Sequence, residues 1–211
     1  MMEVSILCTD ARHPINVPLA QWAERNATRA RVQILRDRGE LGDGDFLFLV
    51  SCQQIIGESV FGRFRHALVL HASALPEGRG MSPHIWQILE GRTNLTVSLL
   101  SVKAELDTGD IWMQRQVHID PAALHEEINA AVFDAEIALM DWALEHCAHS
   151  SPRPQVGTPT YYRKRTPADS EIDPGRPLAE SFDLLRVADP DRYPAFFRLR
   201  GHTYRIRIER K

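Results

Sequence analysis

The sequence predicts an α/β fold with a Rossmann-like, mainly parallel sheet flanked by helices. Short apolar runs of strand length alternate, over the first two thirds of the chain, with segments whose apolar residues recur at helical spacing. This alternation is typical of a parallel sheet with helices on its faces. The length of 211 residues and the 44% hydrophobic content allow one sizeable core and a small appendage.

Six strands and three helices are expected in this part of the chain. Most strands are short apolar runs closed by turn residues, and the six cover residues 3–8, 31–35, 46–51, 67–70, 95–102 and 110–119, with a turn at 43–45. The spacing predicts helices over residues 18–28, 82–90 and 120–146. Asp120 is expected to cap the longest helix, with Pro121 at its first helical position.

The last part of the chain has a different character. Residues 149–160 are rich in Pro, Ser, Gly and Thr and predict a connecting segment. An aromatic and basic run at 161–165, a short helix at 177–188 and a β-hairpin around Gly201 are expected after it. We therefore divide the chain into a main domain, residues 1–148, and a C-terminal extension, residues 149–211.

Charge and composition limit the classes of partner that the protein can have. Residues 1–150 carry 12 basic and 20 acidic residues, a net charge of −8, whereas residues 151–211 carry 13 and 8, a net charge of +5. The basic part is too small and sparse for a nucleic-acid partner. Three cysteines without a CxxC pair suit a reducing compartment. With neither a signal peptide nor an apolar run of membrane-spanning length, we expect a soluble, cytoplasmic protein with no membrane partner.

His71 and Asp107 are the residues best placed for chemistry. The run 67–70 predicts a buried strand that stops at His71, and the run 95–102 leads to a turn that holds Asp107. In an open α/β sheet the crevice at the strand ends is the usual place for a ligand. A histidine can move protons near neutral pH, and an adjacent carboxylate orients its ring. The alternative is a hydrogen-bonded core histidine and an ordinary turn aspartate.

At these residues the chain resembles the folate-dependent formyltransferases, which include methionyl-tRNA, glycinamide ribonucleotide and sugar-nucleotide N-formyltransferases. The family's active-site strand and loop read Asn-x-His-x-Ser-x-Leu-Pro, then Arg-Gly, and a Leu-Asp-x-Gly turn follows later. The matching residues here are His71, Ser73, Leu75, Pro76, Arg79, Gly80, Pro83, Leu106, Asp107, Thr108 and Gly109. The resemblance implies a formyltransferase catalytic domain over residues 1–148, with His71 and Asp107 as its catalytic residues.

One residue departs from the family pattern. The family's Asn, two residues before the histidine, is Val69 here. In related enzymes this Asn holds the formyl oxygen as charge develops on it, and loss of one such donor typically costs about 100- to 1000-fold in rate. Either another donor substitutes, with His71, Ser73 and Gln54 as candidates, or the protein is a degenerate relative that binds folate or nucleotide without catalysis.

The resemblance implies 10-formyltetrahydrofolate as the formyl donor, and no metal. In the family the pterin lies in a slot that two loops form largely from main chain. Apolar walls with free main-chain groups suit a flat heterocycle, although isoleucines in such loops can equally be ordinary core. The corresponding residues here are Gln54, Ile55, Ile56, Val69, Ala104, Glu105 and Leu106.

The tail indicates the acceptor. The tRNA-acting relatives carry a larger C-terminal domain, whereas this tail resembles those of sugar-nucleotide N-formyltransferases, above all enzymes of bacterial nonulosonic (pseudaminic or legionaminic type) acid pathways. The resemblance implies a nucleotide-linked amino-deoxysugar as acceptor, a UDP-4-amino sugar in particular, and a homodimer. Tyrosines can stack on the base and cations can bind the diphosphate, although cation runs are more often solvated surface. The candidate acceptor residues are His13, Arg79, Trp86, Tyr161, Tyr162, Arg163, Lys164 and Arg165.

Other enzyme classes fit less well. A glycinamide ribonucleotide-type enzyme would not need the aromatic and basic tail. The chain has no HExxH motif, and the one compact ligand-like cluster, His146, Cys147 and His149, is interpreted as surface. No GxGxxG follows the first strand, so a dinucleotide oxidoreductase lacks support.

Overall fold

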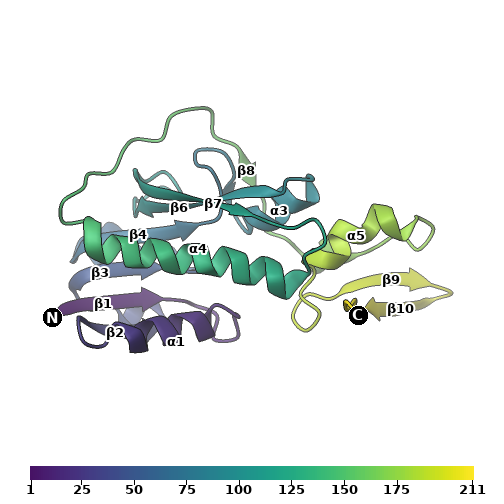
Figure 1. Cartoon of the computed structure of the whole chain (residues 1–211), viewed down its shortest axis with the longest axis horizontal. Coiled ribbons are helices and arrows are strands. Elements are labelled where there is room, and N and C mark those ends of the chain that lie inside the picture. Colours follow the sequence, from purple (N-terminus) through teal and green to yellow (C-terminus); the bar gives the residue numbers. More distant parts are fainter.

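Six strands form one mixed sheet in the computed structural model, which describes all residues from 1 to 211 (Figure 1). The strands lie in the order β2-β1-β3-β4-β6-β7. The first four run parallel, and β6 is antiparallel to both of its neighbours. Their bounds are β1 Met2–Leu7, β2 Ala30–Leu35, β3 Gly44–Leu49, β4 Phe64–His71, β6 Asn94–Ser101 and β7 Ile111–His118.

The predicted α/β fold with a mainly parallel sheet is confirmed, and the two antiparallel pairs involve β6. An apolar run marks a strand without marking its direction. The connection between β6 and β7, residues 102–110, is too short for a parallel crossover and suits antiparallel neighbours. The predicted strand bounds are close to the observed ones, apart from an earlier start of β4 and the start of β3 at Gly44, inside the predicted turn.

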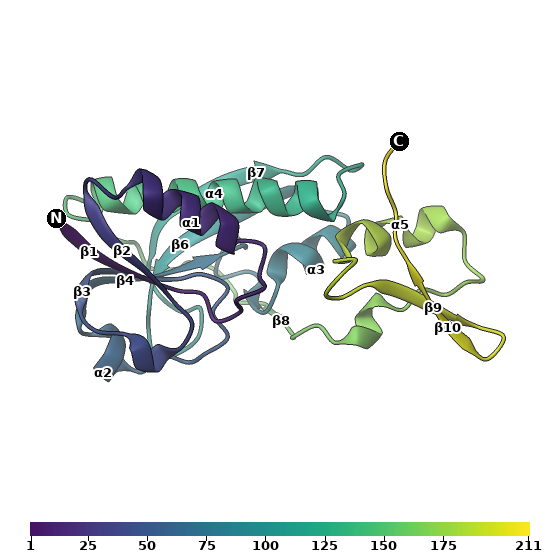
Figure 2. The same ribbon diagram turned by 90° about the horizontal axis from the view of Figure 1, so that it is seen from below.

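The two faces of the sheet are covered unequally. The helices α1 (Asn16–Arg25) and α4 (His125–His146) lie on one face, and the short helix α2 (Glu58–Phe61) lies on the other (Figure 2). The core on the α1–α4 side is large and contains the fully buried Trp22 and Phe48. The core on the α2 side is small. The candidate site lies on the α2 side, where Val69 packs on this smaller core.

Two further elements connect the strands. The 3-10 turn η1 (Arg38–Glu40) lies between β2 and β3, and the helix α3 (Pro83–Leu89) lies between β4 and β6. The predicted helix over 82–90 is thus confirmed, with Gly91 following it at φ +84°. None of the helices has the length and apolar character needed to cross a membrane.

The longest helix begins later than predicted. The Ala122 N–H donates to the Asp120 carboxylate at 2.7 Å, so residues 120–123 form a turn instead of helix. The helix α4 begins at His125, where the Glu127 carboxylate accepts the Leu124 N–H at 2.8 Å and closes the first turn. The predicted cap, Asp120, therefore belongs to the turn that precedes the helix.

The later part of the C-terminal extension, residues 167–211, forms a small unit at one end of the molecule (Figure 1). It contains η2 (Pro167–Ser170), α5 (Leu178–Val187) and a hairpin of β9 (Ala195–Leu199) and β10 (His202–Ile206). The predicted helix and hairpin are confirmed. The small core of this unit consists of Ile172, Leu185, Ala188 and Ala195.

Ion pairs attach the C-terminal unit to the sheet domain. Arg192 pairs with Asp10, which follows β1. Arg210 pairs with Glu127 at 2.9 Å, in the first turn of α4. These contacts hold the C-terminal unit against the end of α4 and the loop after β1.

Candidate active site

His71 ends strand β4, and its side chain lies on the α2 side of the sheet. Val69 and His71 alternate with Leu68 and Leu70, which point into the large core on the opposite face. Only 7% of the His71 side chain is exposed. Its Nε2 lies 2.8 Å from the Gly78 carbonyl oxygen, and a carbonyl can only accept, so Nε2 carries a proton. Nδ1 is the nitrogen left free for proton exchange.

Asp107 faces this free nitrogen. Its Oδ1 lies 3.6 Å from Nδ1 of His71, and only 4% of its side chain is exposed. Its other oxygen, Oδ2, accepts the Gly80 N–H at 2.8 Å. A separation of 3.6 Å is longer than a hydrogen bond, but charges attract strongly at this distance in a buried site. The structure therefore brings together the two side chains that the sequence singled out.

Asp107 reaches His71 by a different route from the one predicted. Because β4 and β6 are antiparallel, their carboxyl ends point to opposite edges of the sheet. The loop 102–110 must turn back from the end of β6, and Asp107 adopts φ +56°, a left-handed conformation that aspartate tolerates better than most residues. Gly109 allows the close return, since a Cβ there would lie 1.7 Å from the Ser101 carbonyl oxygen. Close packing thus explains the glycine of the Leu-Asp-Thr-Gly turn.

Residues 153–162, which we call the strap, cross both loops of the site. Arg153 exchanges two main-chain hydrogen bonds with Ile111, at 2.8 and 2.9 Å. The strap ends as β8 (Tyr161–Tyr162), which pairs in parallel with β5 (Arg79–Gly80). Between these ends, the Thr160 hydroxyl accepts the N–H of Gly78, 82 residues earlier, at 2.8 Å. The sequence predicted only a connecting segment here, because all of these partners are distant along the chain.

Gln155 is the residue of the strap that sequence reasoning missed. Its amide nitrogen donates to the carbonyl oxygens of Asp107 at 2.7 Å and Gly109 at 2.8 Å. Its amide oxygen accepts from Arg79 Nη2 at 2.8 Å. No local signal identifies it, since a glutamine among prolines, serines and threonines has the composition of a linker.

Apolar side chains surround position 69, where the family pattern has an asparagine. Val69 packs against Leu75, Leu100 and Ile111 on the same face as His71. None of these side chains can donate a hydrogen bond to a developing oxyanion. Any stabilising donor must therefore come from another residue.

Two of the three candidate replacement donors differ sharply in availability. The side-chain amide of Gln54 is committed to Asp37 and to the Arg38 N–H, each at 2.8 Å. Ser73 is only 1% exposed, and its hydroxyl has no hydrogen-bond partner in the protein. A buried hydroxyl without a partner is costly, so of these two side chains Ser73 is the one with an uncommitted donor.

The two loops predicted to hold a pterin meet beside Val69. Cys52 and Val102, from the two loops, pack with Val69 against the small core on the α2 side. Ile55 and Leu106 expose 75% and 64% of their surfaces, and Ala104 and Glu105 are also exposed. Large apolar side chains left in water on adjacent loops suit a flat apolar ligand. Ile56 differs, because it is 4% exposed and belongs to the core, as the alternative interpretation had it.

Four of the predicted acceptor residues form one cluster. The Trp86 and Tyr162 rings stack at 6.3 Å between centroids, with an angle of 11° between their planes. The Arg163 and Arg165 guanidinium groups lie 4.8 and 5.9 Å from the Trp86 ring. Hydrogen bonds from Arg163 hold the pKa of Asp169 well below its usual range, so this carboxylate stays charged beside the cluster.

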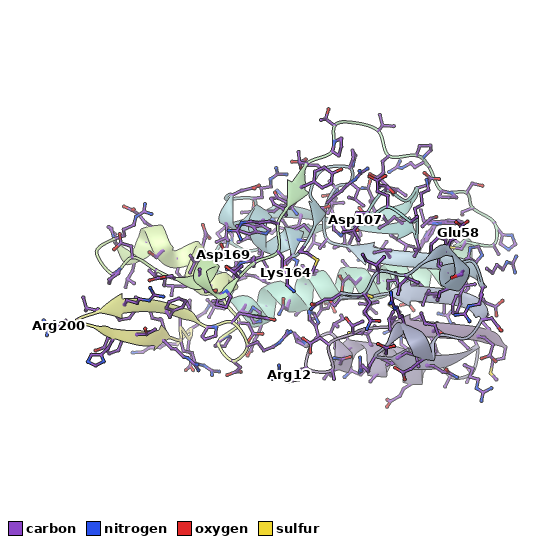
Figure 3. The ribbon with its side chains drawn as sticks, turned by 180° about the vertical axis from the view of Figure 1, so that it is seen from behind. Arg12, Glu58, Asp107, Lys164, Asp169 and Arg200 are labelled. Carbon is purple, nitrogen blue, oxygen red and sulfur yellow. The ribbon has the colours of Figure 1, made fainter.

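The other four predicted acceptor residues lie in different surroundings. Arg79 donates to the hydroxyl of Tyr161, at the end of the strap, at 3.2 Å. Lys164 is exposed, lies near Asp169 and makes no ion pair (Figure 3). His13 packs against Phe133 at 5.8 Å between centroids, and burial lowers its pKa to about 4. His13 is therefore neutral at pH 7 and is a poor anchor for a phosphate.

The compact ligand-like cluster in the sequence does not form a metal site. His146 stacks on Trp142 at 5.1 Å between centroids, and Cys147 is buried. No three His, Cys, Asp or Glu side chains lie close enough together to hold a metal ion.

Comparison with known proteins places this site in a family. The sequence model of the formyl transferase family matches residues 8–144. This range begins just after β1 and ends in the last turn of α4. The chain belongs to the formyl transferase family. A curated relative, methionyl-tRNA formyltransferase from Cereibacter sphaeroides (strain ATCC 17029 / ATH 2.4.9), is 33% identical over 127 residues, which are 60% of this chain and 42% of the relative. The chain thus spans less than half the length of that relative.

Solved structures share the formyltransferase fold over nearly the whole chain. Methionyl-tRNA formyltransferase from Clostridium thermocellum superposes with a TM-score of 0.81 at 26% identity, over 96% of this chain and 90% of that one. HypX from Aquifex aeolicus in complex with tetrahydrofolic acid gives 0.82 at 19%, over 96% and 36%. A 4-N formyltransferase from Francisella tularensis gives 0.79 at 15%, over 100% and 98%. At these last two identities the likeness shows the fold alone.

Proposed function

We propose that this formyl transferase family member is an N-formyltransferase that moves a formyl group from 10-formyltetrahydrofolate to the amine of a nucleotide-linked amino-deoxysugar, specifically a UDP-4-amino sugar. The buried pair of His71 and Asp107 carries the proposal, since one imidazole nitrogen is free and faces a carboxylate. Acyl transfer to an amine needs a group of this kind to take up and return a proton.

The reaction assigns each member of the pair one role. The acceptor amine attacks the formyl carbon, and a C–N bond forms while the amine gives a proton to Nδ1 of His71. His71 returns a proton to N10 of the folate as the C–N10 bond breaks, which leaves a formamide and tetrahydrofolate. Asp107, 3.6 Å from Nδ1, stabilises the imidazolium between the two transfers.

The oxyanion needs a donor that Val69 cannot supply. The Ser73 hydroxyl is the candidate with a free proton, because it is buried near His71 and has no partner in the protein. Protonated His71 supplies a second donor. Together they would replace the single amide of the family pattern.

The formyl donor is assigned to the two loops beside Val69. The exposed side chains of Ile55 and Leu106 and the apolar surface of Val69 and Val102 fit a pterin ring. The structure of HypX in complex with tetrahydrofolic acid supports the assignment, because that protein shares this fold. When bound, the folate supplies the formyl group as an activated amide.

The acceptor is assigned to the aromatic and basic residues around Trp86. Tyr162, stacked on Trp86, offers a ring face for a base, and Lys164, which makes no ion pair, offers charge for a diphosphate. The match over the whole chain to a sugar N-formyltransferase from Shewanella sp FDAARGOS_354 supports a sugar acceptor. The homodimer stays a prediction, as does the domain boundary at residue 148, which the contacts of the strap would move to the end of β8.

An acceptor panel tests the proposed function. The protein is incubated with 10-formyltetrahydrofolate and UDP- or dTDP-linked 3-amino or 4-amino sugars. The masses of the products are measured by mass spectrometry. We expect one formyl group to be added to a UDP-4-amino sugar, and none to the same sugar with its amine acetylated. Methionyl-tRNA serves as a second acceptor class, and exclusive formylation of methionyl-tRNA would reject the sugar assignment.

Val69 favours one other function. A degenerate relative would keep the folded site and bind folate or nucleotide, but would lack the donor that stabilises the oxyanion. Saturable folate binding with no formylated product from any acceptor would identify such a protein. Turnover of any amine would exclude it.

A further inference from the structure

The strap ties the two halves of the candidate site to each other. His71 and the loop after it come from β4, and Asp107 comes from the loop after β6. The strap holds the first loop through Thr160 and β8, and the second loop through Arg153 and Gln155. Its position can therefore set the distance between the two side chains.

Gln155 fixes the main chain on both sides of Thr108. Its amide nitrogen bridges the carbonyl oxygens of Asp107 and Gly109, at 2.7 and 2.8 Å. The Asp107 backbone is left-handed, at φ +56°, a conformation that costs an aspartate free energy unless its surroundings hold it. The sheet holds this turn from one side through the contact of Gly109 with Ser101, and Gln155 holds it from the other.

The same glutamine connects the turn to the loop after His71. Its amide oxygen accepts from Arg79 at 2.8 Å, and the N–H of the next residue, Gly80, donates to the Asp107 carboxylate at 2.8 Å. Hydrogen bonds thus close a ring from the Asp107 main chain through Gln155, Arg79 and Gly80 to the Asp107 side chain. Because both ends of the ring are on Asp107, its carboxylate has little freedom to rotate away from His71.

We propose that Gln155 is a positioning residue, which sets the rate of formyl transfer by holding the Asp107 carboxylate against His71. Its side chain bonds to Arg79, Asp107 and Gly109 and not to His71, so it acts through Asp107. The rate effect rests on the proposed function, whereas the effect on the geometry of Asp107 does not. A displacement of about 1 Å at a reacting group can cost about 100-fold in rate.

Two substitutions separate the roles of the Gln155 amide. Gln155→Ala removes all three hydrogen bonds, while Gln155→Glu keeps an acceptor for Arg79 and loses both donors to the turn. Gln116→Ala is the control, because this glutamine bonds to Thr96 at 3.0 Å on the exposed edge of the same sheet. For each protein we would measure kcat, the KM for the formyl donor, and the exchange rate of the Gly80 amide proton by NMR.

We expect both Gln155 variants to lower kcat by about 10- to 100-fold, with the donor KM within about threefold of wild type. The Gly80 amide should exchange at least about fivefold faster, because its acceptor is no longer fixed. Gln116→Ala should match wild type in all three measurements. Gln155→Glu should lose kcat although it keeps the acceptor for Arg79, because it lacks both donors to the turn.

Three results would overturn the inference. They are a kcat within twofold of wild type in Gln155→Glu, a fall in kcat with unchanged Gly80 exchange, and a change confined to the donor KM. If wild type formylates no acceptor, the proposed function fails, and the Gly80 exchange rate alone decides the role of Gln155. Faster exchange would then support positioning, and unchanged exchange would reject it.

Discussion

Replacement of Gly109 by alanine tests whether the turn that carries Asp107 must lie against the sheet. The added Cβ would lie 1.7 Å from the Ser101 carbonyl oxygen, and ordinary contact begins at 3.4 Å, so the turn must retreat by the difference, roughly 1.7 Å. Main-chain atoms form the contact, so no side-chain rotation can relieve it. This retreat draws the Asp107 carboxylate away from His71. In the wild-type protein the two side chains lie 3.6 Å apart.

The expected result combines lost rate with modest loss of stability. A shift of this size should lower kcat by about 100-fold or more. Overpacking of this kind costs about 1 to 3 kcal/mol of unfolding free energy, which should lower Tm by about 2 to 12 °C for a chain of this length. Formamide production and a thermal melt measure the two effects. Gly42→Ala is the control, since nothing lies within 4 Å of its Cβ. A Gly109→Ala protein with wild-type rate and Tm would refute this packing.

Two further predictions concern a buried acid and the donor slot. Burial raises the pKa of Glu136 from an ordinary 4.5 to about 8, so the folded state holds a proton that the unfolded chain releases, and stability should fall as pH rises from about 4.5 to 8. Glu136→Gln should reduce this fall in unfolding free energy, measured by urea titration at each pH, while the exposed Glu145→Gln should not. The same pH dependence in wild type and Glu136→Gln would contradict the raised pKa of Glu136. Ile55→Ser with Leu106→Ser should weaken folate binding by about 10-fold or more without changing Tm, and unchanged affinity by titration calorimetry would place the pterin elsewhere.

The sheet and the His71–Asp107 pair could be predicted because their signals are local. Strand β4 reads as an apolar run that stops at His71, and the turn residues around Asp107 mark a loop. Strand direction is not local information. The mainly parallel sheet is confirmed, but the sequence did not show that β6 is antiparallel to its neighbours, because an antiparallel strand and a parallel strand carry the same apolar pattern.

The strap could not be predicted because its contacts join residues far apart in the chain. Thr160 and Gln155 bind main-chain groups, which have no side-chain signature in the sequence. The start of α4 was mispredicted for the opposite reason. Two local signals compete there, Asp120 followed by proline and Leu124 followed by Glu127, and only tertiary contacts choose between them.

The central claim is that the His71–Asp107 pair moves the proton during formyl transfer. We would measure single-turnover formamide formation by wild type, His71→Asn and Asp107→Asn, with the affinity for folate measured on the same samples. We predict that both variants bind folate as wild type does and form product at least about 100-fold more slowly. A His71→Asn protein that binds folate and transfers the formyl group at the wild-type rate would contradict the account and move the chemistry to another site.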